Sequence, residues 1–197
     1  MSVVIVDTGC ANLASVGFAI ERLGSSNLIT RDVEVIRSAE RVLLPGVGAA
    51  PSAMQNLREF GLIDCLQELT QPVLGICLGM QILFMRSEEG ACGGLGLIKG
   101  NVTQLETAQF PSPHMGWNTL HDLADDPLLH GINDGDYSYF VHSYAVPVNQ
   151  YTLAKTNYGT PFSAMVRKEN IWGCQFHPER SGQIGAQILA NFLQVRS

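Results

Sequence analysis

The chain has 197 residues, which is enough for one domain of ordinary size with an apolar core. Its 12 Lys and Arg against 18 Asp and Glu give a net charge of −6, so binding to nucleic acid through a basic face is not expected. No run approaches the ~18 apolar residues of a membrane span, and residues 1–7 lack a signal-peptide pattern. We therefore expect a cytoplasmic protein without membrane contact.

Cysteine and charge content narrow the class further. The five cysteines are scattered and none forms a C-x-x-C pair, which favours free thiols over a disulfide framework or a Cys-rich zinc site. Charged residues make up 15% of the chain, below the ~25% usual in soluble domains, as expected if a partner covers part of the surface. Neither a metal nor another cofactor is expected.

The N-terminal half alternates apolar runs with helical spacing. Residues 3–7 are rich in β-branched side chains and predict a strand, and the stripe that starts at Leu13 predicts a helix ending before Gly24. Alternation of this kind predicts a parallel sheet. Further strands are expected at residues 28–30, 41–44 (halted by Pro45) and 73–76, and further helices within 53–60, 62–69 and 78–85.

The C-terminal half contains strands in closer succession and ends in a helix that begins near Ser181. We therefore expect one α/β domain over residues 1–197, with an open, mostly parallel central sheet flanked by helices and extra strands of the second half on the same sheet. The expected later strands are at residues 95–98, 137–141, 151–155, 161–166 and 171–176.

Cys77 follows an apolar run and precedes helical spacing. Its neighbours Gly75 and Gly79 complete a G-x-nucleophile-x-G pattern, which holds a side chain on a tight turn between strand and helix. A thiol at a helix N-terminus faces unpaired amides that favour its thiolate. The pattern indicates a nucleophile, although a buried cysteine between two packing glycines is the structural alternative.

His177 and Glu179 stand two positions apart on an expected strand, so their side chains would share a face. A carboxylate that accepts from one ring nitrogen fixes the imidazole and leaves the other nitrogen for the sulfur. Without Cys77, a surface turn would explain the same residues. Cys174 and His177 could also share a zinc ion, but strand alternation places them on opposite faces. His114 and His142 compete for the role of base, yet neither has an acid two positions on.

Pro45-Gly46-Val47-Gly48 follows an expected strand at the edge where open α/β sheets build their sites. Two glycines around Val47 allow its peptide to turn, so that its N–H could face developing negative charge. An ordinary turn is the alternative explanation of this segment.

Taken together, these motifs resemble those of the class I glutamine amidotransferases, which carry a Cys, His and Glu triad. The motifs occur in the same order as in the family and span the chain from end to end. Within the family, the chain is most similar to the glutaminase subunits of histidine biosynthesis. The blocks that carry it are D-T-G-x-x-N-L-x-S from Asp7, P-G-V-G from Pro45, G-I-C-L-G-M-Q from Gly75, P-H-M-G-W-N from Pro113 and Q-F-H-P-E-R-S from Gln175.

The resemblance implies an enzyme that hydrolyses glutamine and passes the ammonia to a separate (β/α)8-barrel synthase (cyclase) subunit in a heterodimer. There the ammonia would join a phosphoribulosyl-formimino aminoimidazole nucleotide to give imidazole glycerol phosphate and the aminoimidazole carboxamide nucleotide. Such a subunit is expected to depend on its partner, with the Val47 peptide as a switch.

The resemblance also assigns roles to residues. It implies Cys77 as nucleophile, His177 as acid and base, and Glu179 as the carboxylate that orients His177. The implied oxyanion donors are the amides of Val47 and Leu78, the implied glutamine contacts are Gly48, Gln81, Glu89, His142 and Ser143, and the implied synthase contacts are Asn12, Trp117, Tyr139 and Arg180. The family often has lysine at the position of Arg180, which keeps the charge and changes its geometry.

Two alternatives stay open at this point. One is a different triad enzyme, such as the glutaminase of pyridoxal phosphate synthesis or a γ-glutamyl hydrolase, against which the D-T-G-x-x-N and H-M-G-W-N blocks argue. The other is an interaction subunit that keeps the fold without the chemistry, against which the intact Cys, His and Glu set argues.

Overall fold

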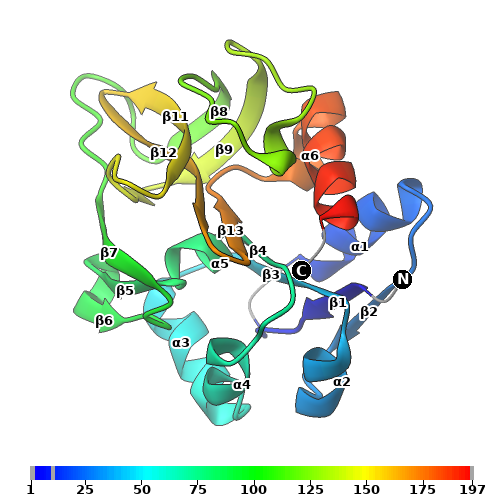
Figure 1. The fold of residues 1–197 in the computed structure, drawn as a ribbon. Coiled ribbons are helices and arrows are strands. Elements are labelled where there is room, and N and C mark those ends of the chain that lie inside the picture. Colours follow the sequence, from blue (N-terminus) through cyan, green and yellow to red (C-terminus); the bar gives the residue numbers. More distant parts are fainter. Residues whose placement is uncertain (1–2, 10–11, 196–197) are drawn as a thin grey trace.

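A seven-stranded sheet forms the centre of the computed structural model, which describes residues 3–9 and 12–195 (Figure 1). Five neighbouring strands are parallel to one another, and each of the two strands at one edge pairs antiparallel with its inner neighbour. The expected mostly parallel sheet is therefore confirmed. In spatial order the strands are β11 (Thr152–Tyr158), β12 (Thr160–Lys168), β13 (Ile171–Cys174), β4 (Val73–Cys77), β3 (Arg41–Gly46), β1 (Val3–Val6) and β2 (Asn27–Thr30).

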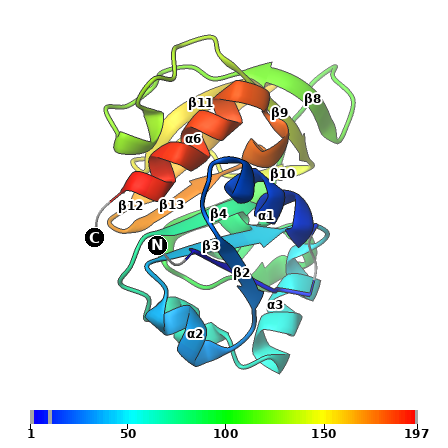
Figure 2. The ribbon, with the colours of Figure 1, turned by 90° about the vertical axis from the view of Figure 1, so that its right-hand side faces the viewer.

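Helices cover both faces of this sheet (Figure 2). The central strands are buried on both sides: in β1, Val3 and Ile5 pack into one apolar cluster, while Val4 and Val6 pack into the other. The first cluster includes residues of α1 (Leu13–Arg22) and α6 (Gly182–Gln194). The second includes residues of α2 (Val33–Ser38), α3 (Ala50–Glu59), α4 (Ile63–Gln67) and α5 (Leu78–Gln81).

Only three of the later strands join the central sheet, which corrects the expectation of one shared sheet. A four-stranded sheet consists of β10 (Tyr144–Ala145), β7 (Ile98–Gln104), β5 (Phe84–Ser87) and β6 (Cys92–Gly93). A separate antiparallel ribbon consists of β8 (His114–Thr119) and β9 (Tyr137–His142). Short 3-10 helices are η1 (Glu89–Ala91), η2 (Pro127–Leu129) and η3 (Pro178–Arg180).

Several expected boundaries were wrong for identifiable reasons. β3 is not halted by Pro45 but pairs with β4 as far as Gly46. Because β1 pairs with β3 only up to Leu43, no ladder donor is needed from Pro45 on that side. The helix expected over residues 78–85 ends after one turn, since β5 pairs with β6 and β7. The strand expected at 95–98 begins at residue 98, and the one expected at 171–176 ends at residue 174.

Helix α2 was not expected, although Asp32 caps it by accepting hydrogen bonds from the amides of Glu34 and Val35. Within the described ranges, no helix combines the length and the apolar character needed to cross a membrane.

Candidate active site

Cys77 lies where β4 ends and α5 begins, with a φ of 54° that L-residues rarely adopt. The tight turn depends on small neighbours. A Cβ added to Gly79 would stand 1.7 Å from the carbonyl oxygen of Leu44, and one added to Gly75 would stand 2.8 Å from the backbone of Gly79. The glycines therefore allow β3, β4 and α5 to approach closely enough to form the turn, and the side chain of Cys77 faces a cavity.

His177 and Glu179 form a buried pair, with 2.8 Å between Nδ1 and Oε1. Their contact is as expected, but the expected geometry is wrong, because β13 ends at Cys174 and residues 178–180 form η3. Tyr139 and Ser181 hold this turn in place. The His177 amide donates to the Tyr139 carbonyl over 2.9 Å, and the Ser181 hydroxyl donates to the His177 carbonyl over 2.7 Å.

The surroundings of His177 favour its protonated form. Burial lowers the pKa of His177, but the Cys77 side chain and the Glu179 carboxylate raise it more, to about 10. Nδ1 donates to Glu179, whereas the buried Nε2 has no hydrogen-bond partner among the described residues. The ring thus has one fixed nitrogen and one nitrogen available for proton transfer.

One cavity of about 330 Å³ gathers most of the predicted site residues. Such a volume suits a small molecule. Its lining includes Cys77 and His177, both expected oxyanion residues and all five expected glutamine contacts, together with Pro113, Val141 and Tyr144, to which the sequence assigned no role. The lining residues are Val47, Gly48, Cys77, Leu78, Gln81, Glu89, Pro113, Val141, His142, Ser143, Tyr144 and His177.

The two expected oxyanion residues approach Cys77 from different elements. Gly46, the last residue of β3, is paired in register with Cys77, so Val47 is the first residue past this pair. Leu78 is the first residue of α5, where backbone amides are not used within the helix. Gly48 has a φ of +93°, which gives the turn after Val47 a conformation typical of glycine.

Glu89 connects the cavity wall to helix α3. Its Oε2 accepts a hydrogen bond of 2.7 Å from the amide of Ala50, the first residue of that helix. A carboxylate at this position also suits the positive end of the helix dipole.

A second, smaller cavity of about 100 Å³ adjoins the first through Val47, Val141 and His177, which line both. Asn12 and Arg180, two of the expected synthase contacts, line this second cavity. Its complete lining is Asn12, Val16, Pro45, Gly46, Val47, Ile76, Val141, His177, Glu179 and Arg180.

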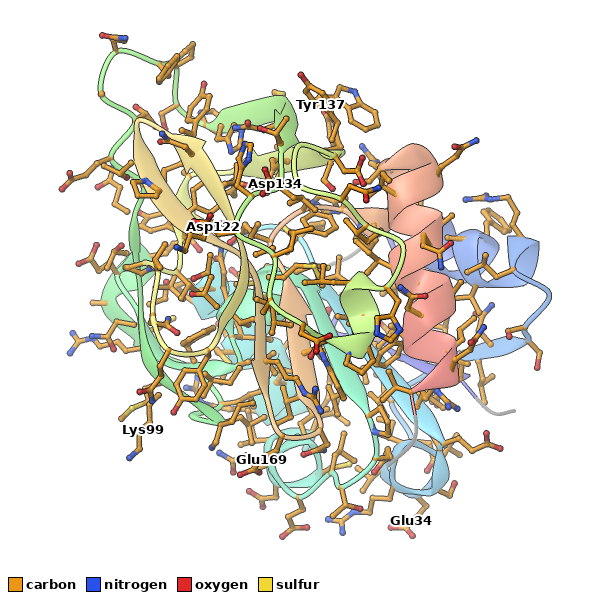
Figure 3. All side chains as sticks on the ribbon, turned by 45° about the horizontal axis from the view of Figure 1, so that its top comes forward. Glu34, Lys99, Asp122, Asp134, Tyr137 and Glu169 are labelled. Carbon is orange, nitrogen blue, oxygen red and sulfur yellow. The ribbon has the colours of Figure 1, made fainter. Side chains whose placement is uncertain are left out.

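The other two expected synthase contacts lie on the β8–β9 ribbon and line neither cavity. Trp117 is 55% exposed, and its ring meets that of Tyr139 edge to face at 5.9 Å. Tyr137, also exposed, lies at the end of the molecule opposite Glu169, which belongs to the turn between β12 and β13 (Figure 3). The ribbon therefore lies toward the end of the sheet where the parallel strands have their carboxyl termini.

His114 and His142 face each other rather than Cys77, with 2.9 Å between Nδ1 of His114 and Nε2 of His142. The Cys174 thiol donates to the Gly75 carbonyl over 3.8 Å, and His177 is bonded to Glu179, so the two residues weighed as a zinc pair have different partners. Across the described residues, no group of three or more His, Cys, Asp or Glu side chains could hold a metal ion.

The family described as "Glutamine amidotransferase class-I" matches residues 5–195. The chain is 56% identical to the imidazole glycerol phosphate synthase subunit HisH of Idiomarina loihiensis, over 99% of this chain and 98% of that protein. It is 53% identical to the protein of the same name from Salmonella typhimurium, over 99% of this chain and 100% of the other.

Solved structures share the fold at lower identity. The structure of PurLQS from Thermotoga maritima has a TM-score of 0.73 at 21% identity, covering 98% of this chain and 97% of the other. A glutamine amidotransferase from the same organism has a TM-score of 0.69 at 15% identity, covering 98% and 96%. At these identities the likeness concerns the fold alone.

Proposed function

Since the chain belongs to the class I glutamine amidotransferases, and within them to the HisH subunits of imidazole glycerol phosphate synthase, we propose that Cys77, His177 and Glu179 carry its glutaminase reaction. The chain is a glutamine-hydrolysing subunit of a histidine-biosynthesis enzyme. The observation that carries the assignment of residues is the cavity of about 330 Å³, which joins Cys77 and His177 to residues drawn from distant parts of the chain.

The reaction begins when the Cys77 thiolate attacks the side-chain amide carbon of glutamine. A C–S bond forms, and the carbonyl electron pair moves to oxygen, where the amides of Val47 and Leu78 stabilise it. Protonated His177 gives its Nε2 proton to the amide nitrogen, the C–N bond breaks, and ammonia leaves with a thioester behind it. Glu179 keeps the imidazole oriented through Nδ1.

Neutral His177 then removes a proton from water, which attacks the thioester carbon. The C–S bond breaks, glutamate leaves, and Cys77 is again a thiolate paired with a protonated imidazole. The balance over both steps is glutamine and water to glutamate and ammonia. The two residues return to their starting state.

In this proposal, glutamine binds in the cavity of about 330 Å³ and contacts Gly48, Gln81, Glu89, His142 and Ser143. Glu89 supplies a carboxylate for the ammonium group of the substrate, and Gln81 supplies an amide near the reacting carbon. These assignments are supported by the fact that all five residues line the cavity that Cys77 faces.

The ammonia passes to a partner in the proposal, a (β/α)8-barrel synthase subunit that converts its aminoimidazole nucleotide to imidazole glycerol phosphate and the aminoimidazole carboxamide nucleotide. The second cavity supports a route, because it shares His177 with the first and reaches Asn12 and Arg180. The exposed Trp117 and Tyr137 on the β8–β9 ribbon supply aromatic surface of the kind that interfaces bury. A cytoplasmic location is part of the proposal, because the four described cysteines are free thiols, as is usual in a reducing compartment.

Changing Cys77 to Ala tests the proposed nucleophile. Glutamate release should fall by roughly 1,000-fold or more, because the attacking atom is removed, while binding to the synthase subunit stays unchanged. The control is Cys92→Ala, a half-buried thiol on β6, which should keep full activity. Turnover retained by Cys77→Ala would contradict the assignment.

A further inference from the structure

Gln175 is a fully buried polar residue that the proposed reaction does not use. It lies between the end of β13 and His177, and its backbone amide donates to the Ala164 carbonyl of β12 over 2.8 Å. Its side chain does not line the cavity. Instead it contacts Cys77 away from the cavity and connects that residue to Gln81.

The orientation of both glutamine amides is fixed by one backbone carbonyl. The Tyr144 carbonyl can only accept, and it lies 2.8 Å from Gln81 Nε2, so the nitrogen of Gln81 must face it. The same nitrogen donates to Gln175 Oε1 over 2.9 Å. Gln175 Nε2 is therefore the atom that faces the Cys77 sulfur, at 3.8 Å.

The Cys77 sulfur thus has two polar neighbours with opposite preferences. The Val141 carbonyl, 3.8 Å away, accepts from the protonated thiol. The Gln175 N–H donates to the sulfur, and this hydrogen bond strengthens when the sulfur becomes negative. Deprotonation makes the first contact repulsive and the second more favourable.

We propose that Gln175 stabilises the thiolate of Cys77 through this N–H, and that Gln81 is the positioning residue that keeps the Gln175 amide turned toward the sulfur. The inference rests on the proposed function, in which Cys77 is the nucleophile. It adds a hydrogen-bond donor behind the sulfur to the donors expected on the side of the substrate.

A second consequence concerns Gln81. Both of its N–H groups are used by Tyr144 and Gln175, so only Oε1 is left for a molecule in the cavity. Gln81 therefore accepts from an N–H of the bound substrate. A donor bound there polarises the chain of amides in the direction that strengthens the hydrogen bond to the sulfur.

Other titratable groups around Cys77 also affect its protonation, and all of these residues are the same in the wild-type chain and in the variants compared. His177 and Glu179 lie on the segment after β13, His142 lies on β9, and Glu89 lies on the cavity wall. Burial, with contributions from Glu179 and Cys77, raises the pKa of Cys174 well above its usual value, so this neighbour remains a neutral thiol.

The test is the pH dependence of Cys77 alkylation by iodoacetamide in the purified full chain, measured on the Cys77 peptide by mass spectrometry. In Gln175→Leu the midpoint should rise by about one pH unit, and the alkylation rate at pH values well below the midpoint should fall about tenfold, since a charge-assisted hydrogen bond is lost. Gln175→Met has a similar length but offers no N–H and adds no charge, and should show the same direction of change. It keeps the test decisive if the leucine variant does not fold.

Gln71→Leu is the matched control, because the Gln71 amide is also used internally, by donating to the Ile36 carbonyl, but lies away from Cys77. It should leave the alkylation midpoint unchanged. A folded Gln175 variant with the wild-type midpoint overturns the inference, even if glutaminase activity is normal. Absence of glutaminase activity in the wild-type chain with its synthase subunit counts against the proposed function instead, so the two failures are distinguishable.

Discussion

At the scale of single residues, backbone shape determines where the sulfur points. Cys77 is held at a φ of 54°, and the space around it leaves no room for a side chain at Gly79. The atom that a Cβ at Gly79 would meet is the carbonyl oxygen of Leu44, which belongs to a buried central strand and cannot move aside cheaply.

Gly79→Ala should therefore displace α5 relative to β3. We expect a loss of about 3 kcal/mol in the free energy of unfolding and a drop of at least about 100-fold in glutaminase activity, measured by urea denaturation and glutamate release. Gly93→Ala is the control, because its Cβ would meet only the Met85 carbonyl oxygen at 3.9 Å. Equal behaviour of the two variants would contradict this account of the turn.

The residue scale also shows the limit of sequence reasoning. The G-x-C-x-G pattern predicted the junction of strand and helix at Cys77, because glycine spacing is a local property of the chain. The role inferred for Gln175 was not predicted, because it depends on Gln81 and Tyr144, whose positions follow from tertiary packing. Similarly, the contact of His177 with Glu179 was predicted from their spacing, whereas the 3-10 turn that provides it was not.

At the scale of elements, the β8–β9 ribbon contains two buried histidines that are cross-strand partners. Burial lowers the pKa of His114 to about 4. The pKa of His142 is lowered to about 3, chiefly by burial and further by His114 and His177, against a hydrogen bond to Tyr144 that raises it. Both are therefore neutral in the folded protein at pH values where an unfolded chain would protonate them.

Stability should consequently decrease on acidification between about pH 6.5 and pH 4, because the unfolded state binds more protons in that interval. Each such proton contributes a slope of up to about 1.4 kcal/mol per pH unit to the free energy of unfolding. In His114→Asn the slope should be smaller, as measured by urea denaturation at a series of pH values. The exposed His130→Asn is the control, and an unchanged slope in His114→Asn would contradict the prediction.

His177 has the opposite linkage. Its folded pKa of about 10 lies above its unfolded value, so its contribution to stability is complete below about pH 6.5 and disappears as the pH rises through about 10. Replacement by Asn should remove this alkaline decline from the urea denaturation series. A decline of the same size in His177→Asn would show that other groups cause it.

Another element-scale prediction concerns the end of α6. The buried Arg41 of β3 donates from its guanidinium to the carbonyl of Phe192, in the last turn of α6, and to the carbonyl of Val195, the residue that follows the helix. Arg41→Met should lower the free energy of unfolding by about 2 to 3 kcal/mol, measured by urea denaturation. The control is Arg22→Met in the exposed last turn of α1, for which less than about 0.5 kcal/mol is expected. Similar losses in both would contradict the capping role.

Element prediction succeeded where the periodicity was strong and failed where pairing decides the structure. The strands β1 and β4 and the helices α1 and α6 were predicted from their apolar patterns. The strand β8 was not, because H-M-G-W-N alternates poorly and Gly116 has a φ of +137°. Its extended form comes from pairing with β9. Helix α6 begins near Ser181 as expected, with Ser181 at the N-cap position, but the Ser181 hydroxyl binds the His177 carbonyl and the Tyr139 amide rather than an amide of the helix.

At the scale of the whole molecule, the proposed chemistry needs a second protein. Ammonia released into water at neutral pH is protonated and lost as a nucleophile, so an isolated glutaminase would be wasteful. Glutamate release by the chain alone should be low, should rise when the synthase partner is added, and should rise again with the synthase ligand. High turnover by the isolated chain, independent of both additions, would contradict coupling between the two proteins.

We propose that the exposed ring of Trp117 lies in the surface that contacts the synthase subunit. Trp117→Ala should weaken binding to the synthase subunit by roughly 10- to 30-fold, measured by calorimetry, with little change in the stability of the chain alone. Leu28→Ala is the control, since Leu28 is similarly exposed but lies on β2, the edge strand of the central sheet. Equal affinity of both variants would place the interface elsewhere.

His177 belongs to the walls of two adjoining cavities, and this shared membership has a consequence for how the products separate. In the proposed mechanism, the nitrogen freed from glutamine receives its last proton from the His177 imidazole, which also borders the second, smaller cavity. The ammonia therefore forms beside that cavity. The glutamyl group stays bound to the Cys77 sulfur in the larger cavity until water attacks the thioester. Sorting of the two products would thus follow from the order of bond breaking and the position of one ring, without any moving gate between them.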